Sequence, residues 1–343
     1  MQIKKFLPVL AATALALVVA GCSAGCSAPA SNTGNTNANG SSSTPAASSA
    51  RLNFVTGGST GTYYAVGGVI ANQVANNTEF AVTSLEGNGS QANIVALEDN
   101  EDQFAFCQSD VMSYAYEGTN LFASTGKVDC FSVVAALYDE AVQIVTTDAN
   151  IKTVADLKGK RVSIGAAGSG VYFNAIDVLG AYGITEADIT PTYQSFGDSA
   201  DALKNGQIDA AFIVAGAPTT AITDLSTSKQ AYLVSMDDAH VNQLLAASPY
   251  YSAITIPANT YTGVTTDTTT VAVNAVILAR NDVSEDAVYA MVSQVFDNLD
   301  SLSTQHAKFK EMTVNKAASI TSVPYHPGAA KYFKEKGITV PTK

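Results

Sequence analysis

Strand-like and helix-like patterns alternate along most of this chain, with short glycine-containing loops between them. Leu52–Thr56 is a β-type run, Gly57–Thr62 is a Gly/Ser/Thr loop, and an apolar-periodic helix pattern then begins. The same order returns in Arg161–Ala181, as RVSIG, then AAGSG, then VYFNAIDVLGA. A strand, a glycine turn and a helix start together present free amide groups at the positive end of a helix dipole. Each unit therefore predicts a binding site for a carboxylate or phosphate group.

The remaining patterns extend the alternation to the end of the chain. They predict strands at Phe80–Leu85, Phe104–Cys107, Phe131–Tyr138, Val142–Thr146, Val162–Gly165, Thr190–Gln194, Ala210–Val214 and Thr270–Ala279. They predict helices at Gln91–Glu98, Val111–Tyr116, Ser199–Lys204, Glu285–Leu302 and Gly328–Lys336. Such alternation favours parallel sheets with helices on both faces, arranged as two small α/β lobes. If the last elements pack on the first lobe, the chain crosses between lobes twice and forms a hinge.

The first residues are typical of an export signal. Lys4 and Lys5 precede an apolar segment of signal-peptide length, Phe6–Ala20, and Val19-Ala20-Gly21-Cys22 resembles a bacterial lipobox. We therefore predict a lipoprotein signal peptide over 1–21, with Cys22 lipidated at the membrane surface; an ordinary signal peptide is the alternative. Residues 22–50 are almost wholly small and polar, which predicts a flexible tether.

Composition narrows the class of protein further. The net charge of −12 argues against a nucleic-acid-binding protein, which needs a basic surface. No later segment is long and apolar enough to span a bilayer. We predict one lobe formed by 51–143 and 269–343, a second formed by 144–268, and an extracytoplasmic, membrane-anchored monomer.

Cysteine and histidine usage predicts no metal centre. An oxidising compartment would permit a disulfide between Cys107 and Cys130, with separate buried thiols as the alternative. Cys26 falls in the tether with no evident partner. The three histidines show no zinc-ligand spacing, so we expect neither metal nor cofactor.

Several motifs together resemble one family of transport receptors. They are GGSTGTYY at 57–64, AFCQSDV at 105–111, DLKGKRVSIG at 156–165, GSG at 168–170, ALKNGQIDAAFIVAGAP at 202–218, TIPANTY at 255–261 and HPGAAKYF at 326–333. The chain is similar in these segments to the TAXI family of solute receptors, which serve tripartite ATP-independent periplasmic (TRAP) transporters. The resemblance covers nearly all of 52–335.

The resemblance implies a type II periplasmic binding protein fold that closes on its ligand about the hinge. It also implies delivery of that ligand to a membrane permease driven by an ion gradient, and no enzymatic activity. Characterised relatives bind small carboxylates, among them glutamate-like amino acids. Cys107 departs from the aliphatic residue that is usual in the family, which could change the shape of the cleft slightly.

The residues themselves suggest how an acid would be held. The arginines after the tether are Arg51, Arg161 and Arg280, and none lies in a glycine loop, so a guanidinium clamp is not expected. Main-chain amides and hydroxyls at the carboxyl ends of strands would replace it. The predicted ligand-binding residues are Gly58, Ser59, Thr60, Gly61, Thr62, Tyr63, Ser90, Gln108, Ser109, Gly168, Ser169 and Gly170. For Ser90 and Ser109, plain helix capping is the alternative role.

The sequence is also compatible with two other functions. Gly57-Gly58-Ser59-Thr60-Gly61 satisfies the G-x-S-x-G pattern of serine hydrolases, in which Ser59 would be the nucleophile. Its place on the first strand argues against this, because no earlier loop supplies the oxyanion hole. The same fold could also report ligand occupancy to a signalling partner.

Overall fold

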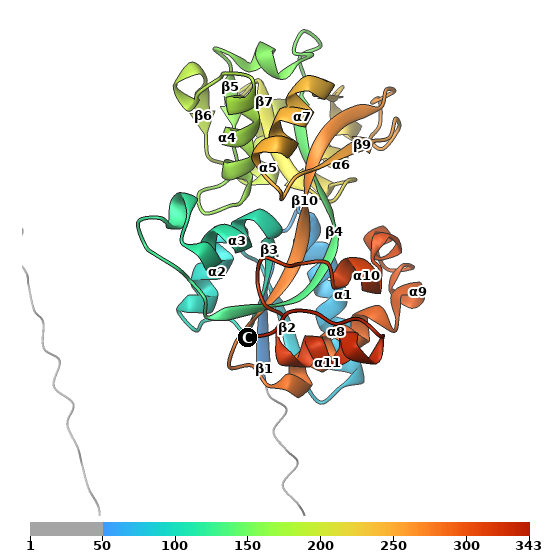
Figure 1. Ribbon diagram of the computed structural model, residues 1–343. Coiled ribbons are helices and arrows are strands. Elements are labelled where there is room, and N and C mark those ends of the chain that lie inside the picture. Colours follow the sequence, from blue (N-terminus) through green and yellow to red (C-terminus); the bar gives the residue numbers. More distant parts are fainter. Residues whose placement is uncertain (1–50) are drawn as a thin grey trace, which may run out of the picture. The chain divides into compact units, whose positions relative to one another are not determined.

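The computed structural model describes residues 51–343, and Figure 1 shows them as two lobes joined by the long strands β4 and β10. The predicted signal peptide, the tether, the lipidated Cys22 and Cys26 lie outside the described residues. Within residues 51–343, no helix is long and apolar enough to cross a membrane.

One mixed sheet runs through both lobes in the order β2-β1-β3-β10-β4-β7-β5-β6, with β8 beside β4 and β9 beside β10. Its strands are β1 (Arg51–Val55), β2 (Ala81–Leu85), β3 (Phe104–Gln108), β4 (Phe131–Thr146), β5 (Arg161–Ser163), β6 (Thr190–Thr192), β7 (Ala210–Ala215), β8 (Tyr232–Leu233), β9 (Ser252–Ile256) and β10 (Thr268–Arg280).

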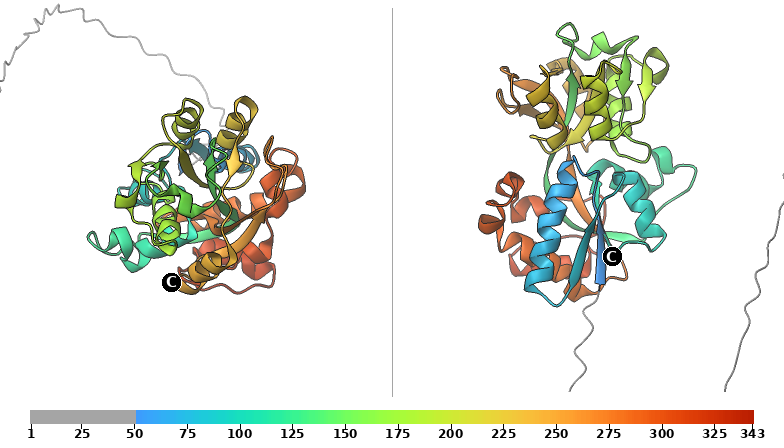
Figure 2. Two further views of the ribbon diagram at one scale, coloured as in Figure 1. Left: turned by 90° about the horizontal axis from the view of Figure 1, so that it is seen from above. Right: turned by 180° about the vertical axis from the view of Figure 1, so that it is seen from behind.

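Helices cover this sheet in both lobes (Figure 2). They are α1 (Thr62–Asn77), α2 (Ser90–Glu98), α3 (Ser109–Glu117), α4 (Val171–Ala181), α5 (Phe196–Lys204), α6 (Thr220–Ser228), α7 (Asp238–Ala247), α8 (Glu285–Phe296), α9 (Leu299–Leu302), α10 (Val314–Ala317) and α11 (Pro327–Glu335). Short 3₁₀ turns are η1 (Asn120–Phe122), η2 (Val154–Leu157), η3 (Glu186–Asp188) and η4 (Ala307–Glu311).

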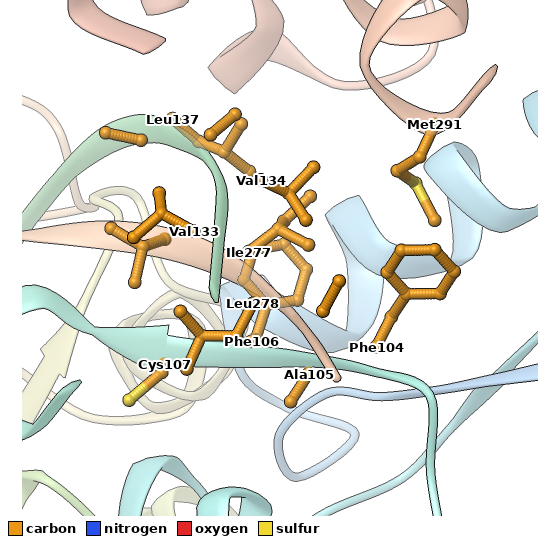
Figure 3. Close-up of a cluster of buried hydrophobic side chains, with 14 of the residues drawn as sticks. Phe104, Ala105, Phe106, Cys107, Val133, Val134, Leu137, Ile277, Leu278 and Met291 are labelled. Atoms are coloured by element: carbon orange, nitrogen blue, oxygen red, sulfur yellow. The ribbon is translucent and has the colours of Figure 1, made fainter. Parts of the chain in front are cut away.

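The two lobes have separate hydrophobic cores. The first lobe contains β1–β3, α1–α3, α8–α11 and one end each of β4 and β10, around a cluster that includes Phe104, Phe106 and Ile277. Figure 3 shows part of this cluster, with side chains from β3, β4 and β10 and with Met291 of α8 near Phe104. The second lobe contains β5–β9 and α4–α7 around two further clusters. Two α/β lobes joined by two crossings are thus confirmed.

The crossing strands differ from the prediction in two respects. The segments predicted as Phe131–Tyr138 and Val142–Thr146 form one strand, β4, which is buried along nearly its whole length. The sheet is mixed and not parallel throughout, because β10 is antiparallel to both β3 and β4, and β4 is antiparallel to β7. A chain that enters the second lobe on β4 and returns on β10 must reverse its direction.

The structure contradicts a Cys107–Cys130 disulfide, since both residues are free cysteines. β10 separates β3 from β4. Cys107 pairs with Val276 of β10, whereas the Cys130 carbonyl accepts from the amide of Asn281, five positions further along. Five residues of strand span about 17 Å. Bridged cysteines have Cα atoms within about 7 Å, so the two thiols lie too far apart.

Candidate functional site

A cavity of about 210 Å³ lies between the two lobes. The first lobe contributes residues from the loop before α1 and the start of that helix, from the loop before α2 and its first residue, from the carboxyl end of β3, and from β4. The second lobe contributes residues from the start of α4, the loop before α5, and β7. The lining residues are Gly57, Gly58, Gly61, Thr62, Tyr63, Glu86, Gly87, Asn88, Gly89, Ser90, Gln108, Glu140, Ala166, Ser169, Gly170, Val171, Gln194, Ser195, Phe196, Val214 and Ala215.

Most of the residues predicted to bind ligand line this cavity. These are Gly58, Gly61, Thr62, Tyr63, Ser90, Gln108, Ser169 and Gly170. The cavity therefore brings together the two glycine loops that the sequence shows more than a hundred positions apart, as well as the carboxyl end of β3. Their role as ligand contacts stays a prediction.

The other predicted residues lie beside the cavity and hold its walls in place. The Ser59 amide donates to Glu86 Oε1 at 2.8 Å, so the protein's own carboxylate already occupies one donor of the first glycine loop. The Ser109 hydroxyl accepts from the Asn274 amide at 3.1 Å.

Thr60 and Gly168 join the two lobes through their carbonyl groups. The Thr60 carbonyl accepts from the Ala221 amide at 3.3 Å, and the Gly168 carbonyl accepts from the Ala92 amide at 2.9 Å. The Thr62 hydroxyl adds a third link by donating to the Gly216 carbonyl at 2.9 Å. The structure thus shows the lobes in contact around the cavity.

Ser90 is the first residue of α2 and not the side-chain cap that the sequence suggested, because Gly89 occupies the N-cap position with φ of 98°. Its hydroxyl instead accepts from the Gln108 amide at 3.0 Å and contacts Gln108 Oε1 at 3.3 Å. A positive φ is costly for residues other than glycine, which explains glycine there. Ser90 thereby fixes the end of β3 against α2.

The start of α4 depends on close approach of the backbone. A Cβ atom on Gly170 would lie 1.4 Å from Gln108 Oε1 and 2.9 Å from Ser90 Oγ. Only glycine lets the second lobe come this near to the first. The Ser169 hydroxyl is buried beside it with no hydrogen-bond partner among the described residues.

Glu140 is a cavity-lining residue that the sequence prediction missed. It is 2% exposed, lines the cavity, and accepts the Tyr63 hydroxyl on Oε2 at 2.6 Å. Burial raises the pKa of this carboxyl well above its usual value, and the Tyr63 hydrogen bond and the Lys308 charge offset only part of that effect. The sequence did contain a sign of it, since Asp139 and Glu140 interrupt the long apolar run of β4.

Burial, and next the charge of Glu140, raise the pKa of the Tyr63 hydroxyl well above its usual value. The phenol therefore keeps its proton and acts as a donor. The Tyr63 ring stacks on Phe106, with ring centroids 4.5 Å apart. These contacts place the hydroxyl in the cavity wall and show that Tyr63, and not the exposed Tyr64, faces inward.

No basic side chain lines the cavity within the described residues. Arg161 pairs with Asp209, and Arg280 pairs with Asp282. The Arg280 side chain is largely buried, with 14% of its surface exposed. Lys308, whose charge acts on Glu140, binds Glu311 at 2.6 Å.

A buried polar network joins the lobes behind the cavity. Gln108 Nε2 donates to Asn174 Oδ1 at 2.8 Å, and Asn174 Nδ2 donates to Asp110 Oδ2 and to the Tyr251 hydroxyl, both at 2.9 Å. The Tyr251 hydroxyl in turn donates to Asp177 at 2.8 Å. Burial raises the pKa of Asp110 to about 7 although hydrogen bonds oppose the shift.

The alternative of a serine hydrolase finds no catalytic histidine beside Ser59 in the described residues. His240 pairs with Asp237, His306 Nδ1 accepts from the Lys308 amide, and His326 Nδ1 accepts from the Gly328 amide. Across residues 51–343, no group of three or more His, Cys, Asp or Glu side chains is arranged to hold a metal ion.

Two α/β lobes, two crossing strands and a cavity between them define a periplasmic binding protein fold of type II. The chain belongs to the NMT1-like family, whose model matches residues 54–337.

Solved structures with a similar arrangement share little sequence with this chain. A protein from Bordetella bronchiseptica RB50 is 14% identical over 84% of this chain and 89% of its own, with a TM-score of 0.51. The alkanesulfonate-binding protein SsuA from Xanthomonas axonopodis pv. citri, bound to MOPS, is 16% identical over 85% and 92%, with a TM-score of 0.43. A Salmonella typhimurium periplasmic binding protein of high arginine specificity is 14% identical over 77% and 99%, with a TM-score of 0.41. At 14% identity, the likeness to the Bordetella bronchiseptica protein concerns the fold alone.

Proposed function

We propose that this protein is an extracytoplasmic solute-binding receptor that captures a small carboxylate between its lobes and has no enzymatic activity. The observation that carries the proposal is the cavity, which both lobes line and which hydrogen bonds between the lobes surround. A volume of about 210 Å³ suits a small metabolite. Drug-sized ligands use pockets of about 300–1,000 Å³.

Two helix starts would supply donors for the carboxylate. Thr62 opens α1 and Val171 opens α4, and both line the cavity. The first amide groups of a helix lack partners within it, and the helix dipole favours an anion there. Hydrogen bonds to charged groups contribute about 1.5–3 kcal/mol each. Several of them would reach the roughly 8 kcal/mol of a micromolar ligand without an arginine.

The resemblance to the TAXI family supports a TRAP permease, driven by an ion gradient, as the partner that receives the ligand. In this role the lobes 51–143 with 269–343 and 144–268 would open and close about β4 and β10. A ligand sensor with a signalling partner is the second candidate. Ligand uptake by cells that express this receptor with a TRAP permease, abolished when the ion gradient is collapsed, would separate the two.

The proposed function predicts that a small acid stabilises and closes the soluble part, residues 51–343. We expect L-glutamate, L-glutamine or a related acid to raise the melting temperature by mass action. Small-angle scattering should show a smaller radius of gyration on saturation with that acid. If no amino or organic acid in the screen changes either quantity, the proposed function is wrong.

The proposed lipid anchor makes a separate prediction. Cys22→Ser should move the protein from the membrane fraction to the soluble fraction, because it removes the predicted site of lipidation. Ligand affinity of the released protein should equal that of residues 51–343, since the cavity residues are unchanged. Cys26→Ser is the matched control and should stay with the membrane. Retention of the Cys22→Ser variant on membranes would contradict the anchor.

A further inference from the structure

Of the two carboxyl oxygens of Glu140, one accepts a hydrogen bond and the other does not. Oε2 accepts the Tyr63 hydroxyl at 2.6 Å, whereas no group among residues 51–343 hydrogen-bonds to Oε1. The side chain is 2% exposed and part of the cavity wall. Buried polar groups in folded proteins nearly always have partners. Glu140 Oε1 is not one of the fully enclosed polar atoms that lack a partner, so it keeps access to the cavity and can accept from a group of the ligand.

The surroundings of Glu140 supply little positive charge. Lys308 is the one basic group acting on it, and its ammonium is bound to Glu311 at 2.6 Å. The other ionisable groups coupled to Glu140 are acids, phenols or a thiol: Tyr63, Tyr138, Asp139, Asp110 and Cys107. None of these is a cation.

This environment selects the chemistry of the ligand. A second carboxylate placed beside Glu140 would gain no ion pair, and it would meet a like charge whenever Glu140 is ionised. An ammonium group offers three donors and a positive charge, and it would satisfy the free oxygen. The helix starts of α1 and α4, which favour an anion, line the same cavity. A solute with both charges fits these two kinds of subsite.

We propose that Glu140, oriented by Tyr63, is the acceptor for the ammonium group of the solute, so that the receptor selects amino acids over acids that lack an amine. This inference rests on the proposed function of the cavity. It assigns a residue to the ammonium end of the solute, for which the sequence analysis proposed none.

Glu140 also links binding to a proton. Burial raises the pKa of its carboxyl well above the usual value, so the empty cavity favours the protonated form. An ammonium group beside it would favour the carboxylate. Binding of an amino acid would then release a proton to solvent, whereas binding of the acid without the amine would not.

The test compares each amino acid with its counterpart that lacks the amine. Titration calorimetry on residues 51–343 would use L-glutamate against glutarate and L-aspartate against succinate. We expect the better-bound amino acid to bind at least 100-fold more tightly than its counterpart. In Glu140→Gln that preference should fall below tenfold, with binding of glutarate or succinate retained or improved.

Glu117→Gln is the matched control, because Glu117 is an exposed glutamate at the end of α3 in the first lobe and does not line the cavity. It should keep the preference of the wild-type protein. Calorimetry of the wild-type protein in two buffers of different ionisation enthalpy should also show proton release with the amino acid. Because the proton-release measurement uses only the wild-type protein, it tests the assignment even if Glu140→Gln does not fold.

The outcomes separate the two proposals. If glutarate or succinate binds as tightly as its amino acid, or if Glu140→Gln keeps the full preference, the Glu140 assignment is wrong and the proposed function stands. If the amino acid binds without proton release, the assignment is also overturned. If no acid of either kind binds, the proposed function itself fails, and the assignment fails with it.

Discussion

Gly170→Ala should abolish most of the ligand affinity by keeping the lobes apart. The new Cβ would lie 1.4 Å from Gln108 Oε1, which is far inside contact distance. The Gln108 side chain cannot easily move away, because it is hydrogen-bonded to Ser90 and Asn174 and the residue is 3% exposed. Overpacking of this kind costs about 1–3 kcal/mol, which is roughly a 5- to 150-fold loss of affinity.

Gly180→Ala is the control on the same helix. Gly180 lies near the end of α4, and nothing lies within 4 Å of the Cβ that it would gain. That variant should bind L-glutamate as the wild-type protein does. Scattering should show a larger radius of gyration for Gly170→Ala than for Gly180→Ala at saturating L-glutamate. Equal affinities and equal radii would show that the close approach at Gly170 does not control closure.

Asp110→Asn should remove a pH-dependent part of the stability. Burial raises the pKa of Asp110 to about 7 in the folded protein, whereas an unfolded aspartate titrates near 3.9. Between these values the folded state holds a proton that the unfolded state has released, so the free energy of unfolding falls as pH rises. About three pKa units correspond to roughly 4 kcal/mol, present below pH 4 and lost as pH rises through 7.

Urea unfolding of residues 51–343 from pH 4 to pH 8 would measure this contribution. An asparagine cannot ionise, so the stability of Asp110→Asn relative to wild type should rise over that range. Any fixed cost of the amide, which would face the position where Asp110 Oδ1 has no partner, should be the same at every pH. The exposed Asp224→Asn serves as control and should track the wild type. A difference between Asp110→Asn and wild type that does not vary with pH would contradict the prediction.

Local pattern predicted most of the elements, but not how far each extends. The helix expected at Glu285–Leu302 divides into α8 and α9, and the helix expected at Ser199–Lys204 begins earlier, at Phe196. The last case has a local cause, because Ser195 caps α5 by accepting from the Asp198 amide at 3.2 Å. Helix boundaries depend on such single hydrogen bonds, which the apolar period does not encode.

Part of the candidate site could be predicted because it is built from local features of the sequence. Glycine loops that follow strands and open helices are local features, and Gly61, Thr62, Ser169 and Gly170 line the cavity. Glu140 was not foreseeable as a partner of Tyr63, because the two are 77 positions apart and meet only in the folded protein. The distance between Cys107 and Cys130 could not be predicted either, because it depends on β10, which lies between β3 and β4 in the sheet.

The sequence by itself determined the alternation of strands and helices, the division into two α/β lobes and the lack of an arginine in either glycine loop. These follow from neighbouring residues, whose propensities and spacing act over one turn or one strand. Only the tertiary structure decided which amides remain free, which acid faces the cavity and where glycine is required for contact between lobes. These depend on groups distant in sequence, since burial and close approach exist only after the lobes have packed.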